Sequence, residues 1–171
     1  MHEDIDPQNP PPTRVGCQGL VRLESGQVLV VRPTYEDRRY QLPGGHRHRG
    51  ERRTSAASRE LFEETGLTLP RGRLLVVDEI DERPGVHTAG LNFVYDYGTI
   101  PLSTASIRLP APPGNGEPAE LDAFLWLAPD LLDEYCADYM AKRIRRSEQA
   151  RAENTVFDLL RGELIEPEGQ H

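Results

Sequence analysis

The chain has 171 residues, of which 37% are hydrophobic and 6% aromatic, values typical of one folded domain rather than two domains or a disordered chain. Its 28 acidic and 20 basic side chains give a formal charge of −8, which argues against nonspecific binding to nucleic acid or to anionic membrane surfaces. No apolar run approaches the roughly 18 residues of a membrane-spanning helix. A small phosphorylated ligand is compatible with this charge if basic side chains gather locally.

Residues 1–14 are rich in proline and poor in apolar side chains, which predicts a disordered tail. Residues 15–165 are predicted to form a single domain that includes a C-terminal helix. The start of the chain does not have the charged segment, apolar stretch and cleavage site of a secretion signal. We therefore expect a reducing, cytoplasmic location, with Cys17 and Cys136 as buried free thiols; a disulfide between them is the alternative.

The first predicted elements form a β-hairpin near the centre of a sheet. Apolar residues between Val15 and Leu23 indicate one strand, Ser25 and Gly26 form a turn, and 28–31 is the second strand. Pro33 ends the second strand. A polar loop then leads to the sequence Leu-Pro-Gly-Gly at residues 42–45, where glycine allows close backbone approaches.

An acidic motif follows these glycines. Glu51 comes six residues after Gly45, and Glu60, Glu63 and Glu64 stand at positions i, i+3 and i+4, which lie on one face of a helix. Like charges at this spacing destabilise a helix, so the arrangement indicates a bound cation. Carboxylates are hard oxygen ligands, and Mg²⁺ commonly binds one or two of them together with substrate phosphates. The motif predicts a divalent-metal site for a phosphorylated ligand.

The stretch from Gly45 to Leu67 resembles the signature of the Nudix family. Nine specified positions in these 23 residues match: Gly45, Glu51, Arg59, Glu60, Leu61, Glu63, Glu64, Gly66 and Leu67. The sequence at residues 42–45 is also common in that family. A surface helix with a solvated acidic run would explain the three clustered glutamates but not the spacing of the other positions.

The ends of this helix have their own signals. Thr54 or Ser55 is the expected N-cap, and Gly66 suits the left-handed residue just past the C-terminus. Ala57 and Leu61 give the helix an apolar side for packing.

The remaining elements alternate irregularly. We predict strands over 74–80, 91–97 and 121–127, a turn at 83–85, a long loop over 101–118, a helix start at 129–132, and a helix over about 137–160 that is interrupted near 153–155. This order favours an α/β fold with a mixed central sheet and helices on both faces. The resemblance implies the same architecture, a Nudix-type α/β/α sandwich with the motif helix against the sheet.

The resemblance also implies roles for individual residues. Glu60, Glu63 and Glu64, with the carbonyl of Gly44, would bind Mg²⁺ or Mn²⁺. Arg59 would orient a motif glutamate, either Glu51 or Glu60, through a charge-assisted contact.

The general base is open, because in this family it can lie inside the motif or on a distant loop. Glu63 and Glu60 are candidates inside the motif, and Glu117 and Glu120 are candidates at the end of the long loop. Glu120 is the preferred candidate outside the motif. The alternative for Glu117 and Glu120 is an ordinary solvated loop charge.

Six arginines flank the glycine turn: Arg38, Arg39, Arg47, Arg49, Arg52 and Arg53. Arginine binds phosphate through two parallel hydrogen bonds, and Arg47 and Arg49 are our candidates for the substrate phosphates. His46 and His48 are interpreted as exposed loop residues, since two histidines without a third fitting ligand are weak evidence for a transition metal.

Two further features favour a structural interpretation. The basic run at 142–146 is interpreted as the solvated face of a helix whose Tyr139 and Ile144, with Phe157 and Leu160, pack inward. Tyr35, Tyr40, Tyr95 and Tyr97 are assigned to core or cross-strand packing, with stacking on a base as the alternative.

The resemblance implies a hydrolase that cuts the pyrophosphate bond of a nucleoside diphosphate linked to another group. Pro84, 17 residues after Leu67, occurs at about that distance in members that act on ADP-ribose, so ADP-ribose or a nucleotide sugar is favoured. A nucleoside triphosphate, as in nucleotide-pool cleaning, is the first alternative. A binding module without hydrolysis is the second. We expect a small nucleotide partner, no nucleic acid or membrane partner, and a possible homodimer.

Overall fold

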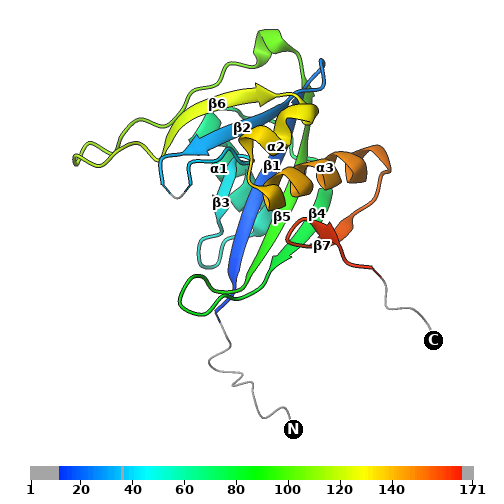
Figure 1. Ribbon diagram of the computed structural model, residues 1–171. Coiled ribbons are helices and arrows are strands. Elements are labelled where there is room, and N and C mark those ends of the chain that lie inside the picture. The colour runs from blue at the N-terminus through cyan, green and yellow to red at the C-terminus, as the bar shows by residue number, and fades with distance from the viewer. Residues whose placement is uncertain (1–11, 36, 167–171) are drawn as a thin grey trace, which may run out of the picture.

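A computed structural model describes residues 12–35 and 37–166 (Figure 1). The strands are β1 (Arg14–Leu23), β2 (Val28–Pro33), β3 (Gly44–His46), β4 (Leu74–Ile80), β5 (Gly90–Ile100), β6 (Leu121–Leu127), β7 (Phe157–Leu160) and β8 (Glu163–Leu164). The α-helices are α1 (Arg53–Thr65), α2 (Leu132–Tyr135) and α3 (Asp138–Ala152), and 3-10 turns occur at η1 (Leu102–Thr104) and η2 (Pro129–Leu131). Most of the predicted tail lies outside the described residues, and β1 begins at Arg14, within the last residues assigned to that tail.

The strands form one mixed sheet in the order β6-β2-β1-β5-β4-β7-β8, and β3 pairs with β1 beside β2. The pairs β1–β5 and β4–β7 are parallel, whereas β1–β2, β1–β3, β2–β6, β4–β5 and β7–β8 are antiparallel. The predicted hairpin of β1 and β2 is therefore confirmed, and β1 lies near the middle of the sheet.

Helices cover both faces of this sheet, with α3 in front and α1 behind in the view of Figure 1. On one face, Ala56, Ala57 and Leu61 of α1 pack against strand residues that include Val21 and Leu29. On the other face, side chains of α3 pack against a second cluster from the strands. The predicted α/β/α sandwich with a mixed sheet is confirmed.

The predicted C-terminal helix is too long. Helix α3 ends at Ala152, Asn154 adopts a positive φ of 53°, and 157–160 is strand β7, parallel to β4. The short segment 157–160 forms a strand because the free edge of β4 supplies backbone partners that a sequence pattern does not reveal. Leu160, expected to pack inward, is 38% exposed, and Leu159 is buried instead.

The interpretation of the basic run is wrong for one of its members. Arg143 is only 2% exposed, and its Nε donates to Oδ2 of the buried Asp78 at 2.6 Å. Lys142, Arg145 and Arg146 are more exposed, as expected of a solvated face.

The two cysteines and three of the four tyrosines are placed as predicted. Cys17 and Cys136 are buried and free, and burial raises the pKa of each thiol to about 11. Tyr95 and Tyr97 are buried, and Tyr40 packs edge-on against the ring of Tyr135. Among the described residues, no helix has both the length and the apolar character needed to cross a membrane.

Candidate active site

Two glycines bring strand β3 close to the acidic helix. The N–H of Gly44 donates a hydrogen bond to Oε2 of Glu64 at 2.7 Å, and a Cβ at Gly44 would lie 2.3 Å from the carbonyl oxygen of Cys17. A Cβ at Gly45 would lie 2.6 to 2.7 Å from the carboxyl atoms of Glu60. The missing side chain at Gly45 therefore lets Glu60 lie directly against the β3 backbone, the Gly44 N–H holds Glu64 there, and the missing side chain at Gly44 lets β3 pack against β1.

The helix α1 that carries these acids ends as predicted but begins differently. Gly66 adopts a left-handed conformation with φ of 74°, and its N–H donates to the carbonyl of Phe62. The N-cap is Arg52, without a side-chain hydrogen bond, and Thr54 and Ser55 lie within the first turn. The N-cap prediction was wrong because the helix already begins at Arg53, directly after the turn that contains Glu51.

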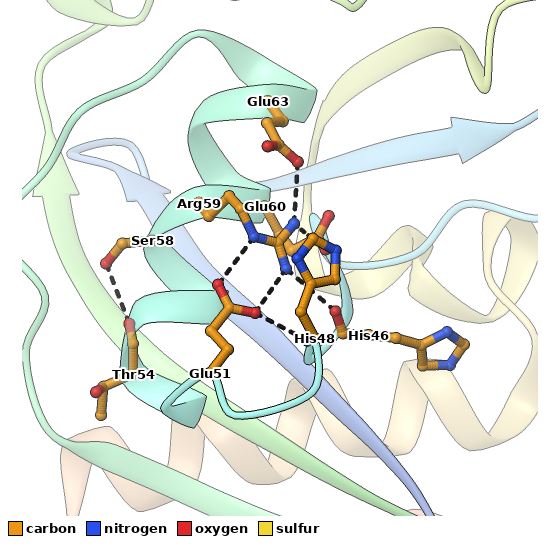
Figure 2. Close-up of polar contacts among 8 residues, drawn as sticks. All are labelled: His46, His48, Glu51, Thr54, Ser58, Arg59, Glu60 and Glu63. Atoms are coloured by element: carbon orange, nitrogen blue, oxygen red, sulfur yellow. Dashed lines mark hydrogen bonds and ion pairs between the residues drawn. The ribbon is translucent and has the colours of Figure 1, made fainter.

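Arg59 is the centre of an ionic network on this helix (Figure 2). Its guanidinium binds Glu51 through two parallel hydrogen bonds, both 2.9 Å long, and it contacts Glu60 at 2.6 Å and Glu63 at 3.0 Å. It also donates to the carbonyl oxygen of His46 at 3.1 Å. Arg59 thus links three motif glutamates to the end of β3, and it contacts both Glu51 and Glu60, the two partners considered from the sequence.

The bidentate contact has a measurable consequence for Glu51. Hydrogen bonds from Arg59 and from the His48 N–H lower the pKa of Glu51 from 4.5 to about 2. A carboxyl whose pKa is lowered by folding adds stability that is fully present above pH 4.5 and is lost as the pH falls through about 2.

We expect the Arg59→Met substitution to return the pKa of Glu51 most of the way to its ordinary value, because the backbone hydrogen bond is the smaller cause. A ¹³C NMR titration of the Glu51 carboxyl measures this pKa directly. Arg59→Lys is the matched variant, since lysine keeps the charge without the planar fork and should give a smaller rise. An unchanged Glu51 pKa in Arg59→Met would contradict the network.

Glu64 is a buried acid whose carboxylate accepts a hydrogen bond from the Gly44 N–H. Glu64 is 6% exposed. Burial raises the pKa of Glu64 to about 8, although the hydrogen bond from the Gly44 N–H lowers it. The three charges that act on it most, those of Glu60, Glu120 and Glu63, are all acidic and raise its pKa further.

Glu60 and Glu63 differ in exposure. The Glu60 side chain is 14% exposed, and burial raises its pKa despite the contact with Arg59. The Glu63 side chain is 55% exposed and turns toward Arg59 (Figure 2). Glu60 and Glu64 therefore form the buried part of the acidic cluster, and Glu63 forms its exposed edge.

The charge of Glu120 acts on this cluster although Glu120 is 60 positions away from Glu60 in the sequence. Its charge is among the causes that raise the pKa of both Glu60 and Glu64. Thr34, just past β2, fixes the backbone here, since its N–H donates to the Glu120 carbonyl at 2.9 Å and its hydroxyl donates to the Ala119 carbonyl at 2.8 Å. Glu117 and Glu120 are both exposed.

Comparison with known proteins agrees with this arrangement. A family model described as the NUDIX domain matches residues 12–147. The chain belongs to the Nudix family. With that family membership and the complete motif, it is a Nudix pyrophosphohydrolase.

Individual relatives are distant. A MutT-like protein of Streptomyces ambofaciens is 28% identical over 146 residues, which cover 84% of this Nudix chain and 82% of that protein. The MutT protein from Methanosarcina mazei Go1 has a TM-score of 0.65 and 23% identity, with 84% of this chain and 96% of that chain covered. The NUDIX domain of Shewanella oneidensis NrtR, solved with ADP ribose, has a TM-score of 0.62 and 16% identity over 87% and 98% of the two chains. The two structures share the fold of this chain.

Nudix hydrolases generally use divalent metal ions, and the donor set of this chain fits such an ion. Among residues 12–35 and 37–166, no three His, Cys, Asp or Glu side chains are already gathered as a metal site, and Arg59 contacts both Glu60 and Glu63. The fit rests instead on the chemistry of the donors. The Glu64 carboxylate offers hard oxygen donors, and a divalent cation would offset the burial and the neighbouring acidic charges that raise its pKa.

The loop that follows β3 is basic and exposed. Arg47, His48 and Arg49 lie on this loop, as interpreted for His48, whereas the exposed His46 is the last residue of β3 and pairs with Gly16. Together with Thr13, Arg14 and Val15 they line a shallow pocket of about 250 Å³. The cationic side chains thus lie on the loop that connects β3 to the acidic helix α1.

Sequence reasoning missed several residues that support the site. Gln18, on β1, lies opposite Gly44 in the register of β1 and β3, and Thr34 fixes the backbone at Glu120. The sequence offered one usable signal, since Asp78 interrupts the apolar run of β4 and a charged residue in a buried strand needs a partner.

Proposed function

We propose that this Nudix pyrophosphohydrolase cleaves the pyrophosphate bond of a nucleoside diphosphate linked to another group, and that Mg²⁺ or Mn²⁺ is its metal ion. ADP-ribose or a nucleotide sugar is the favoured substrate. The observation that carries the proposal is the placement of Glu60 and Glu64 against the Gly44–Gly45 backbone, with no side chain between them. This placement brings carboxylate oxygens and backbone carbonyl oxygens together at one site.

Glu60, Glu63 and Glu64, with the carbonyl of Gly44, would hold the metal ion. When bound, the ion neutralises phosphate charge and polarises the phosphoanhydride bond. Glu63 is the motif carboxylate most open to solvent, so it is able to reach the substrate side without a change in α1. Release of Glu60 and Glu63 from Arg59 frees the two carboxylates, while the two hydrogen bonds to Glu51 keep the guanidinium in place.

The general base would deprotonate the attacking water. Glu120 is supported by the effect of its charge on Glu60 and Glu64, and it lies outside the motif, directly before β6. Glu63 and Glu60 are the alternatives within the motif, and Glu117 has no such support. Arg47 and Arg49 would contact the substrate phosphates from the basic loop.

A nucleoside triphosphate pyrophosphatase is the second candidate. It stays open because the motif from Gly45 to Leu67 does not determine which group is joined to the nucleotide. The third alternative from the sequence, a binding module without hydrolysis, is disfavoured by the family membership and by the complete set of motif glutamates.

The test is a substrate panel with Mg²⁺ that contains ADP-ribose, nucleotide sugars and nucleoside triphosphates. Alkaline phosphatase does not act on intact ADP-ribose or nucleotide sugars, so its release of phosphate reports the monophosphates that hydrolysis forms. Inorganic pyrophosphatase reports pyrophosphate from the triphosphates. We expect phosphate from the first group; pyrophosphate alone would select the second candidate, and no release from a folded, metal-binding protein would favour the third.

We also make proposals about the domain organisation, the location and the oligomeric state of the chain. We propose a single domain over residues 15–165, which is supported by the membership of β7 and β8 in the same sheet as β1. A cytoplasmic location is supported by the two free thiols. A homodimer, without a nucleic-acid or membrane partner, is a prediction that size-exclusion chromatography with light scattering can check.

A further inference from the structure

A buried polar network lies on the face of the sheet opposite α1. Nε of Arg143 donates to Oδ2 of Asp78 at 2.6 Å, and Nη1 of Arg143 donates to Oε1 of Gln18 at 2.9 Å. The N–H of Gly162 donates to Oδ1 of Asp78 at 3.0 Å. Gln18, Asp78 and Arg143 are all buried, so each hydrogen bond is shielded from water and fixes the side chains that it joins.

Gln18 is the member of this network that reaches the candidate active site. It pairs with Gly44 in the antiparallel register of β1 and β3, and the next residue, Gly19, donates its N–H to the carbonyl of Pro43 at 2.9 Å. A Cβ at Gly44 would lie 2.6 Å from Cα and 2.9 Å from Cγ of Gln18. The aliphatic part of Gln18 is therefore packed directly against the Gly44 backbone.

Gly44 connects this packing to the acidic cluster. Its N–H is the hydrogen-bond donor to Glu64, on the other side of the sheet from Arg143. A continuous series of contacts thus runs from Asp78 through Arg143 and Gln18 to Gly44, and from there to Glu64. Rotation of the Gln18 side chain would remove support from the peptide that holds the Glu64 carboxylate.

We propose that Gln18, held in one rotamer by the buried Arg143, is a positioning residue that fixes the Gly44 peptide and with it the Glu64 carboxylate for metal binding. The inference rests on the proposed function, since it assigns Glu64 to the metal ion. Gln18 and Arg143 both lie outside the Nudix motif, and their hydrogen bonds join them to each other and to Asp78 rather than to a motif glutamate. Outer residues that orient a ligand typically change metal affinity about 10- to 100-fold when they are replaced.

Two substitutions distinguish the packing of Gln18 against Gly44 from its hydrogen bond with Arg143. Gln18→Met keeps an unbranched side chain against Gly44 but removes the acceptor for Arg143, and Gln18→Ala removes both. Leu127→Ala is the matched control, because Leu127 is buried in the same core cluster but lies on β6, where it pairs with Val28. All variants are studied in the full chain, well below their thermal midpoints.

The first readout is the Kd for Mn²⁺ without substrate, measured by electron paramagnetic resonance, and the second is the hydrogen-exchange rate of the Gly44 amide. For Gln18→Ala we expect a Kd about tenfold higher and faster exchange at Gly44. Gln18→Met should shift both values in the same direction by less. Leu127→Ala should lower the thermal midpoint but leave both readouts at wild-type values.

The same measurements distinguish failure of the proposed function from failure of the positioning role. If wild-type protein does not bind Mn²⁺, the proposed function fails, whereas faster Gly44 exchange in Gln18→Ala would still support positioning. If wild-type protein binds Mn²⁺ and Gln18→Ala matches it in Kd and exchange, the positioning role is wrong. Equal changes in Leu127→Ala would reduce Gln18 to an ordinary contributor to stability.

Discussion

Glu63→Gln is expected to lower kcat by about two orders of magnitude or more, the scale for loss of a key electrostatic group in an active site. Glu63 is the exposed edge of the acidic cluster, 55% exposed and held by Arg59 at 3.0 Å. Glutamine keeps the shape of the side chain and removes its charge. Because an exposed ion pair adds little to stability, the thermal midpoint should change by only a few degrees.

Glu153→Gln is the control for this substitution. Glu153 caps α3, on the opposite face of the sheet from α1, and glutamine retains the oxygen that accepts a hydrogen bond from Gln149. Steady-state kinetics at saturating Mg²⁺, with circular dichroism of both variants, make the comparison. Wild-type kcat in Glu63→Gln would remove Glu63 from the mechanism.

Gly45→Ala is expected to lower kcat/KM about 100-fold, although it adds only one methyl group. The new Cβ would lie 2.6 to 2.7 Å from the carboxyl atoms of Glu60, so this carboxylate has to move. A displacement of about 1 Å at a catalytic group is sufficient for an effect of that size. The backbone need not change, since the clash is with the end of a side chain and Gly45 does not have a positive φ.

Gly90→Ala is the matched control. Gly90 also lies in a strand without a positive φ, and a Cβ there would approach no atom closer than 3.6 Å. Measurement of kcat/KM and of the Mg²⁺ concentration for half-maximal activity compares the two alanines. If Gly45→Ala keeps wild-type values for both, the position of Glu60 against β3 is not required for activity.

Local patterns predicted the motif helix and its surroundings well. Three acids at i, i+3 and i+4, Ala57 and Leu61 on the apolar side, and Gly66 after the last turn fix both the existence and the end of α1. The N-cap was missed because it is Arg52, a residue without capping chemistry, and its side chain makes no capping hydrogen bond. Regular periodicity is visible in a sequence, whereas an irregular helix start is set by the preceding loop.

Features that depend on distant partners could not be predicted. The segment 157–160 becomes a strand only because β4 has a free edge beside it, and Arg143 is buried only because Asp78 and Gln18 meet it on that face. In the sequence, Arg143 belongs to a basic run whose other basic residues, Lys142, Arg145 and Arg146, are more exposed. Glu120 was proposed from its position before β6, but only the folded sheet shows that it lies beside Glu60 and Glu64.

The most direct test of the central claim is hydrolysis of ADP-ribose by the full chain with Mg²⁺ and with excess EDTA, followed by chromatographic identification of the products. Cleavage of the pyrophosphate bond predicts AMP and ribose 5-phosphate in equal amounts, formed with Mg²⁺ and absent with EDTA. Equal rates in EDTA would contradict a divalent-metal site at Glu60, Glu63 and Glu64. Absence of products from ADP-ribose, nucleotide sugars and nucleoside triphosphates alike, in Mg²⁺ and in Mn²⁺, would contradict the proposed hydrolysis itself.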